Sequence, residues 1–193
     1  MANLSSTELK RLHREWRRRT EGRLAVAIDG VQGPFNVGAI IRSAAAYRAE
    51  QLWITEGSTG PDNSKVGKTA LGTDRYLQVA TLATATTVAD AARSAGFRVI
   101  GVELAAGARP LHEMDLRGNV CLMVGHEDRG LSKAGLEACD QLGFLPQLGR
   151  VGSLNVATAA SIAMYEWARQ QWNPAAAPPD PAAAPPDPSG FVA

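Results

Sequence analysis

The stretch VGSLNVATAASIAMYEWARQQW, residues 151–172, carries the strongest structural signal in the chain. It opens with the tetrapeptide GSLN, residues 152–155, which is too polar and too tight for a helix interior. It then continues without a break into an Ala-rich apolar segment, and we predict a closing helix over 153–172. Because the first backbone N–H groups of a helix lack intrahelical partners, such a turn can hold a polar ligand.

Outward from this stretch, apolar runs alternate with segments that have a helical pattern. We predict strands at 24–28, 51–55, 76–80, 97–103, 120–124 and 142–146. Helices are expected between them, at about 36–47, 66–71, 86–95 and 131–139. This alternation predicts an α/β domain over 24–172, with a mostly parallel sheet and flanking helices.

The charge distribution is uneven, although the net charge of the 193 residues is only +1. Seven of the twenty Lys and Arg residues fall within 10–23: Lys10, Arg11, Arg14, Arg17, Arg18, Arg19 and Arg23. We predict a basic helical extension over 1–23 that contacts a polyanion. A solvated helix face explains such a run equally well.

Other features exclude several classes of protein. Cys121 and Cys139 lack the spacing of a metal site, so we expect no metal and two reduced core thiols. The chain begins without an apolar signal segment and has no run long enough to cross a membrane, which predicts a cytoplasmic protein without a membrane partner.

After Asn173, AAAPPDP occurs twice, which predicts a disordered tail over 173–193.

Two nucleotide-binding signatures are absent. No GxGxxG follows a predicted strand. The tripeptide Gly67-Lys68-Thr69 imitates the end of a phosphate-binding loop, but Asp62 stands where that loop needs its first glycine, and its charge would repel phosphates. The sequence therefore does not predict a dinucleotide-binding protein or an NTPase.

Three glycine-containing loops follow predicted strands, at 102–107, 125–132 and 144–155. Ligands of open α/β sheets bind beyond the carboxyl ends of the strands, so these loops are placed to form a pocket. A fourth segment, 35–47, carries Arg42 among apolar residues of a helix that we expect to be buried. That arginine needs a carboxylate or a phosphate, and a structural ion pair with Glu127 is as plausible as a functional role. Asn36 fits the N-cap of the same helix.

The residues Asn36 and Arg42, the loop Gly125-x-Glu127-xx-Gly130, and the run Ser153-Leu154-Asn155-Val156 resemble motifs 1, 2 and 3 of the SpoU/TrmH family. This family comprises S-adenosylmethionine-dependent RNA ribose 2′-O-methyltransferases of the SPOUT superfamily. The resemblance covers about residues 20–172. The chain departs from the family pattern at Leu145-Pro146-Gln147, where Ile-Pro-Met is frequent, and at His126, where the family often has Ser.

The resemblance implies a C-terminal trefoil knot and bound S-adenosylmethionine. It also implies a homodimer, in which the closing helix and motif 1 complete each active site across the interface. Trp167 and Trp172 would pack either at that interface or in the core. The implied cofactor-binding residues are Val102, Glu103, Leu104, Gly125, Leu145 and Leu154. The implied catalytic residue at the reacting hydroxyl is Arg42, which stabilises the developing alkoxide. The other implied catalytic residues orient Arg42 and the ribose: Asn36, Glu127, Ser153 and Asn155.

The resemblance also implies an RNA substrate. Arg11, Arg14, Arg17, Arg18 and Arg19 would supply phosphate contacts from the basic extension. A basic helix on a minimal catalytic domain is similar to the transfer-RNA branch, so we expect guanosine 2′-O-methylation of tRNA. The alternatives are a 23S rRNA 2′-O-methyltransferase and a non-catalytic RNA-binding protein on the same fold.

Overall fold

The computed structural model describes residues 3–172, and the chain divides into two compact units. One unit comprises residues 22–170 and contains the α/β domain, whereas the other contains the N-terminal helix and the last residues of the closing helix. The predicted disordered tail, 173–193, lies outside the described residues. Within residues 3–172, no helix combines the length and the apolar character needed to cross a membrane.

The α/β domain is built on a seven-stranded sheet in which every pairing is parallel. Its strands are β1 (Leu24–Asp29), β2 (Gln51–Thr55), β3 (Gln78–Leu82), β4 (Arg98–Val102), β5 (Arg109–Pro110), β6 (Val120–Gly125) and β7 (Gln141–Phe144). The strand order is β3-β2-β1-β6-β4-β7-β5. The predicted α/β class with a parallel sheet is confirmed. The trefoil knot stays a prediction that the family implies.

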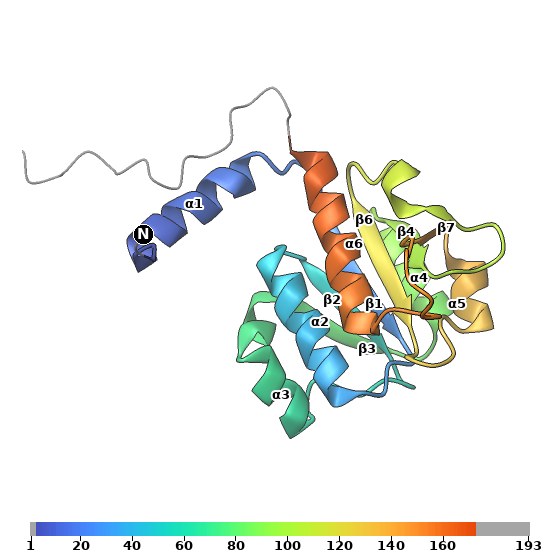
Figure 1. Ribbon diagram of the computed structural model, residues 1–193. Coiled ribbons are helices and arrows are strands. Elements are labelled where there is room, and N and C mark those ends of the chain that lie inside the picture. Colours follow the sequence, from blue (N-terminus) through green and yellow to red (C-terminus); the bar gives the residue numbers. More distant parts are fainter. Residues whose placement is uncertain (1–2, 173–193) are drawn as a thin grey trace, which may run out of the picture. The chain divides into compact units, whose positions relative to one another are not determined.

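Helices cover both faces of the sheet (Figure 1). They are α2 (Pro34–Ala46), α3 (Ser64–Ala70), α4 (Ala85–Ser94), α5 (Lys133–Ala138) and α6 (Val156–Gln171), with short 3₁₀ helices at η1 (Thr73–Tyr76) and η2 (Leu111–Glu113). On one face, α2 and α6 lie side by side, and the hydroxyls of Ser43 and Ser161 are 2.8 Å apart. On the other face, α4 and α5 pack on alternate strand residues, including Ala27 and Met123.

The central strands explain why the sheet is parallel and covered twice. All six residues of β1 and all six of β6 are buried, and Asp29 at the end of β1 is the one charged residue among them. Such continuous apolar strands need helices on both faces. Both cysteines are free thiols; Cys121 is buried on β6 and Cys139 is half-buried, and burial raises the pKa of the Cys139 thiol to about 12. Trp167 is 2% exposed, and its indole N–H donates to the Gly118 carbonyl, so it belongs to the core.

Several predicted boundaries are shifted. The helix of motif 1 begins at Pro34 after Gly33, so the prediction that Asn36 caps it is wrong. Proline at the first helical position supplies a suitable φ and loses no hydrogen bond there, which explains the earlier start. The third strand lies at 78–82 instead of 76–80, because the 3₁₀ turn η1 occupies the preceding residues. The two-residue β5 has no sequence signal, since it is too short to show a period.

The N-terminal unit contains the predicted basic helix, α1 (Ser6–Arg18). Ser5 and Glu8 form a capping box, with the Ser5 backbone N–H donating to the Glu8 carboxylate at 2.7 Å. None of its residues is buried. The rings of Trp16 and Trp172 pack with centroids 4.6 Å apart, and the Arg19 guanidinium lies 5.3 Å from the Trp16 ring centre.

Candidate active site

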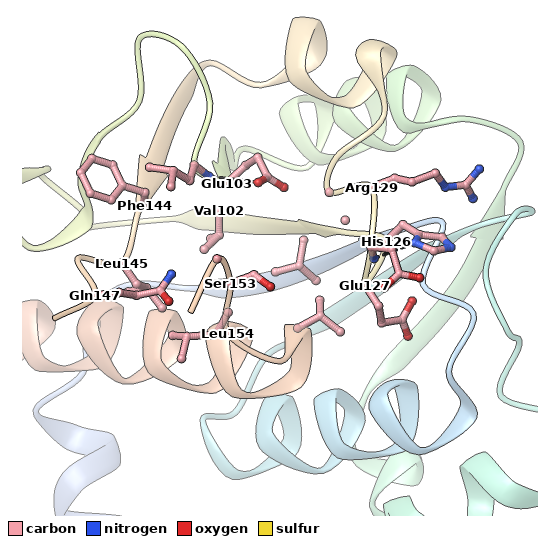
Figure 2. A pocket seen from close by; sticks show the side chains of 18 residues that line it. Val102, Glu103, His126, Glu127, Arg129, Phe144, Leu145, Gln147, Ser153 and Leu154 are labelled. Atoms are coloured by element: carbon pink, nitrogen blue, oxygen red, sulfur yellow. Dashed lines mark hydrogen bonds between the residues drawn. The ribbon is translucent and has the colours of Figure 1, made fainter. Parts of the chain in front are cut away.

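A cavity of about 510 Å³ lies beyond the carboxyl ends of β4, β6 and β7, bordered by the loops that follow them and by the start of α6 (Figure 2). The strand order reverses nearby, because β2 and β3 lie to one side of β1 and β6 to the other. This is the location that the open-sheet rule predicts for a ligand. All six residues predicted to bind the cofactor line the cavity: Val102, Glu103, Leu104, Gly125, Leu145 and Leu154.

Two glycines allow the loop after β6 to fold tightly against the cavity. A Cβ atom at Gly125 would overlap the backbone of Gly130 and Leu131, so only glycine fits there. Gly130 has a φ of +68° and packs against the Glu103 carboxylate. The backbones of His126 and Gly130 exchange two hydrogen bonds of 2.9 Å, which close the loop.

Glu103 joins the loops that follow β4 and β6. One carboxylate oxygen accepts the backbone N–H of Leu131 at 3.0 Å, and the other accepts the N–H of Leu104 at 3.0 Å. The side chain borders the cavity in Figure 2. Glu103 therefore stabilises the cavity wall by accepting backbone N–H groups of both loops. A sequence pattern does not reveal such contacts.

A chain of polar side chains connects the three motifs. The Glu127 Oε1 atom accepts hydrogen bonds from the Asn36 amide at 2.9 Å and from the Gly33 backbone N–H at 2.8 Å. The Asn36 Oδ1 atom in turn accepts from the Asn155 Nδ2 group at 2.9 Å. Motif 2 is thus linked to motif 1, and motif 1 to motif 3. The structure brings together three of the five predicted catalytic residues.

These hydrogen bonds also set the charge state of Glu127. Partial burial raises the pKa of its carboxyl, but hydrogen bonds from the Asn36 amide and from backbone N–H groups, including those of Gly33 and Gln32, outweigh burial. The pKa of Glu127 therefore lies below its ordinary value of 4.5. The group is an anion at neutral pH and acts as a hydrogen-bond acceptor.

Asn155 caps the closing helix. Its Oδ1 atom accepts from the backbone N–H groups of Ala157 at 3.0 Å and Thr158 at 3.2 Å. The helix therefore begins at Val156, three residues later than predicted, and Ser153 lies in the preceding turn as part of the cavity wall. The turn at 152–155 presents Ser153 and Leu154 to the cavity in Figure 2, and its role in holding a polar ligand stays a prediction.

Two expectations for Arg42 are wrong. The side chain is exposed, so the prediction that it is buried is wrong. The structural ion pair with Glu127 is also wrong, because no ion pair of Arg42 occurs within residues 3–172 and Glu127 bonds to Asn36 instead. The buried stripe of α2 runs through Val37, Ile40, Ile41 and Ala44, and Arg42 lies off that stripe. It does not line the cavity.

The five arginines predicted to contact RNA lie on α1 or directly after it. Arg14, Arg17 and Arg18 are exposed. Arg11 pairs with Glu15 at 3.3 Å, and Arg19 lies over the Trp16 ring. Three of the five side chains are therefore exposed to solvent.

Several cavity residues have no counterpart among the predicted ones, notably His126, Arg129, Phe144 and Gln147. The Gln147 Oε1 atom is buried and has no hydrogen-bond partner within the described part of the chain. The signal for it was present in the sequence, since glutamine replaces an apolar residue of the family pattern. A buried carbonyl without a donor is costly, so a ligand with an N–H or O–H group is expected at this place.

Comparisons with known proteins identify related methyltransferases. The 23S rRNA (guanosine-2′-O-)-methyltransferase RlmB of Xanthomonas axonopodis pv. citri is 38% identical over 149 residues, which cover 77% of this chain and 59% of that one. The curated relatives are longer than this chain, which spans 38% of a tRNA/rRNA methyltransferase from Synechocystis and 62% of RlmB from Pseudomonas aeruginosa.

Solved structures give the same result. An AdoMet-bound rRNA methyltransferase from Sinorhizobium meliloti has a TM-score of 0.72 and 31% identity, over 78% of this chain and 57% of that one. The SpoU methyltransferase AviRb from Streptomyces viridochromogenes, in complex with AdoMet, has a TM-score of 0.71 and 31% identity, over 78% and 61%. S-adenosylmethionine (AdoMet), the expected cofactor, is thus the one that these neighbours bind. The family model described as the SpoU rRNA Methylase family matches residues 23–165, and the chain belongs to that family.

Proposed function

We propose that this protein is an AdoMet-dependent RNA methyltransferase that methylates a ribose 2′-hydroxyl. The observation that carries the proposal is the hydrogen-bonded chain Glu127–Asn36–Asn155, which joins all three family motifs beside one cavity. A protein that kept only the fold would not need this alignment of polar groups. The proposal thus favours an enzyme over a non-catalytic RNA-binding protein.

The cavity suits the cofactor. Its volume of about 510 Å³ lies in the usual range for small-molecule sites. Val102, Leu104, Leu145 and Leu154 provide apolar surface for an adenosine group, and the unpartnered Gln147 carbonyl oxygen provides an acceptor for one of its N–H or O–H donors. When bound, AdoMet supplies an activated methyl group on a sulfonium.

The residues of the chain then have to align the ribose and stabilise the developing charge. Correct alignment alone contributes on the order of 7 to 11 kcal/mol in the best cases. A guanidinium stays protonated, so Arg42 acts by binding the adjacent phosphate and stabilising the developing alkoxide, and a phosphate oxygen or water takes the proton. Ser153 and Asn155 orient the ribose, and Asn36 and Glu127 hold Asn155 in place.

A homodimer explains why Arg42 is exposed and away from the cavity of its own chain. The helices α2 and α6 carry exposed apolar side chains: Phe35 (64%), Ile162 (41%) and Tyr165 (48%). The two helices are adjacent, so these residues offer one apolar face to a second copy. Across that face, Arg42 of one copy would reach the cavity of the other. Sedimentation analysis of the Ile162→Asp variant tests the proposed homodimer, and the variant is expected to be a monomer.

For the substrate, we propose a guanosine ribose of 23S rRNA instead of the tRNA expected from the basic extension. The support is the 23S rRNA (guanosine-2′-O-)-methyltransferase activity for which relatives such as the Xanthomonas protein, 38% identical, are named. We also propose a cytoplasmic location, because the rRNA methyltransferases that the chain resembles come from bacteria such as Xanthomonas. The basic helix α1 then supplies salt-dependent phosphate contacts that carry little sequence information.

The test is to incubate the protein with labelled AdoMet and, in separate reactions, with 23S rRNA and total tRNA, followed by mapping of the 2′-O-methyl position. Labelled ribose in 23S rRNA is the expected result. Labelled tRNA alone would restore the substrate that the sequence predicts. Calorimetry with AdoMet separates an inactive enzyme from a binding protein, because a pure RNA-binding protein takes up no cofactor.

A further inference from the structure

A second cavity, of about 520 Å³, opens at the amino ends of the strands. It is lined by residues that lead into β1, β2, β3 and β4, whereas the candidate active site lies beyond the carboxyl ends. Strands of five or six residues are roughly 17 to 20 Å long, so the two cavities lie at opposite ends of the sheet's strands and are separate sites. The methyl transfer proposed above gives this second cavity no role.

The floor of the second cavity is aromatic. Trp53 and Phe97 are almost completely buried, and their rings meet edge to face with centroids 6.1 Å apart. The Arg23 guanidinium lies 4.6 Å from the Phe97 ring centre and pairs with Glu50 at 2.8 Å. One cation of the cavity is therefore neutralised and built into its wall.

The rim carries an exposed aromatic ring with a cation beside it. Tyr76 is 64% exposed. The Arg75 guanidinium lies 4.8 Å from its ring centre and donates a hydrogen bond to its hydroxyl at 2.8 Å. Exposed rings next to cations are the means by which proteins bind unpaired nucleotides, since bases stack on the ring and phosphates meet the charge.

Arg48 supplies a further cation, at a position where the backbone favours glycine. Its φ is +57°, and it follows the end of α2 in a turn closed by hydrogen bonds from Arg48 N to Ala45 O and from Ala49 N to Ala44 O. This is a Schellman turn, in which glycine is the usual residue. Within residues 3–172, the Arg48 guanidinium has no ion-pair or hydrogen-bond partner. The chain thus places a free positive charge on the rim despite an unfavourable backbone conformation.

We propose that this second cavity binds an unstacked nucleotide of the RNA substrate, with the base against Tyr76 and the flanking phosphates at Arg48 and Arg75. The lining residues include three arginines, Arg23, Arg48 and Arg75, and a single carboxylate, that of Glu50, so the cavity favours an anion. A nucleotide supplies both the anion and the flat ring. The inference rests on the proposed function, because RNA is the substrate there.

The decisive variant is Arg48→Gly, measured by fluorescence anisotropy with a fluorescein-labelled single-stranded uridine oligomer at several salt concentrations. Loss of one phosphate contact lowers the slope of log affinity against log salt by about 1. Glycine suits this backbone conformation, so the variant keeps or raises the melting temperature, and weaker binding is not a result of misfolding. Tyr76→Ala is expected to weaken binding about fivefold or more, through lost stacking.

Leu71→Gly is the matched control. Leu71 also has a positive φ, of +54°, at the end of α3, and it does not line the second cavity. The control is expected to reproduce the thermal effect and to leave RNA affinity and its salt slope unchanged.

The proposal is overturned if Arg48→Gly and Tyr76→Ala bind the oligomer with wild-type affinity and salt slope, or if the wild-type protein does not bind it. Failure of the proposed function has a different signature. There, the wild-type protein transfers no methyl group to 23S rRNA or tRNA, whatever the cavity variants do with the oligomer.

Discussion

Glu127→Gln tests the hydrogen-bonded chain of the candidate active site. Glu127 accepts three hydrogen bonds from neighbouring groups: Oε1 accepts from Asn36 Nδ2 and Gly33 N, and Oε2 accepts from Gln32 N at 3.2 Å. A glutamine keeps one acceptor oxygen and places an NH₂ group against the remaining donor. It therefore retains two of these bonds, without their charge, and loses the third.

Hydrogen bonds to charged groups contribute about 1.5 to 3 kcal/mol each, so the substitution should cost about that much free energy of unfolding. In a chain of this length, each kcal/mol shifts the melting temperature by about 2 to 4 °C, which gives a decrease of about 3 to 12 °C. This decrease in melting temperature is measured by thermal unfolding at neutral pH, monitored by circular dichroism. Glu56→Gln is the control, because Glu56 is an exposed carboxylate without a side-chain partner within residues 3–172.

The difference between wild type and Glu127→Gln should depend on pH in one direction. The pKa of Glu127 is lower in the folded protein than its ordinary 4.5, so its charge stabilises the fold fully above about pH 4.5. That stabilisation is lost as the pH falls through the folded-state pKa. The gap in melting temperature should narrow on acidification. Equal melting temperatures at neutral pH, or a gap that widens in acid, would refute the role of this carboxylate.

Further predictions concern the other residues of the site. Asn155→Ala removes the cap of α6, so the melting temperature should fall by about 2 to 4 °C, corresponding to about 1 kcal/mol; no change in a thermal scan would contradict the capping contacts. Gln147→Met should weaken AdoMet binding about fivefold in calorimetry, because the buried acceptor is lost; unchanged affinity would exclude a hydrogen bond from the cofactor. Arg42→Ala should keep AdoMet binding and lose most methyl transfer to RNA. Turnover near that of the wild type would contradict the proposed catalytic role of Arg42.

Much of the fold follows from local pattern. The apolar runs at β1 and β6 predict buried strands, since residues that are apolar on both faces cannot border water. Gly125 and Gly130 mark the loop that borders the cavity. Gln147, which stands where the family pattern has an apolar residue, carries the buried oxygen without a hydrogen-bond partner within the described residues. Arg42 could have been placed correctly as well, because the stripe through Val37 and Ile41 leaves it outside the buried side of α2.

The polar contacts of the site could not be predicted in this way. Asn36 and Asn155 are 119 residues apart in the chain, and no local pattern indicates that their side chains meet. Asn36 in particular has the signature of a helix cap, yet it lies within the helix and bonds to Glu127. Which partner an amide finds depends on the packing of distant segments, and this packing is absent from any short window of sequence.

The sequence by itself determined the alternation of strands and helices, the loops at the strand ends and the turn at 152–155 before an apolar helix. Periodicity and glycine positions are local properties, so they can be seen without coordinates. Only the tertiary structure decided that Asn155 both caps α6 and bonds to Asn36, and that Arg48 and Tyr76 border a second cavity. Each of these depends on groups brought together by the parallel sheet, whose neighbouring strands come from distant parts of the chain.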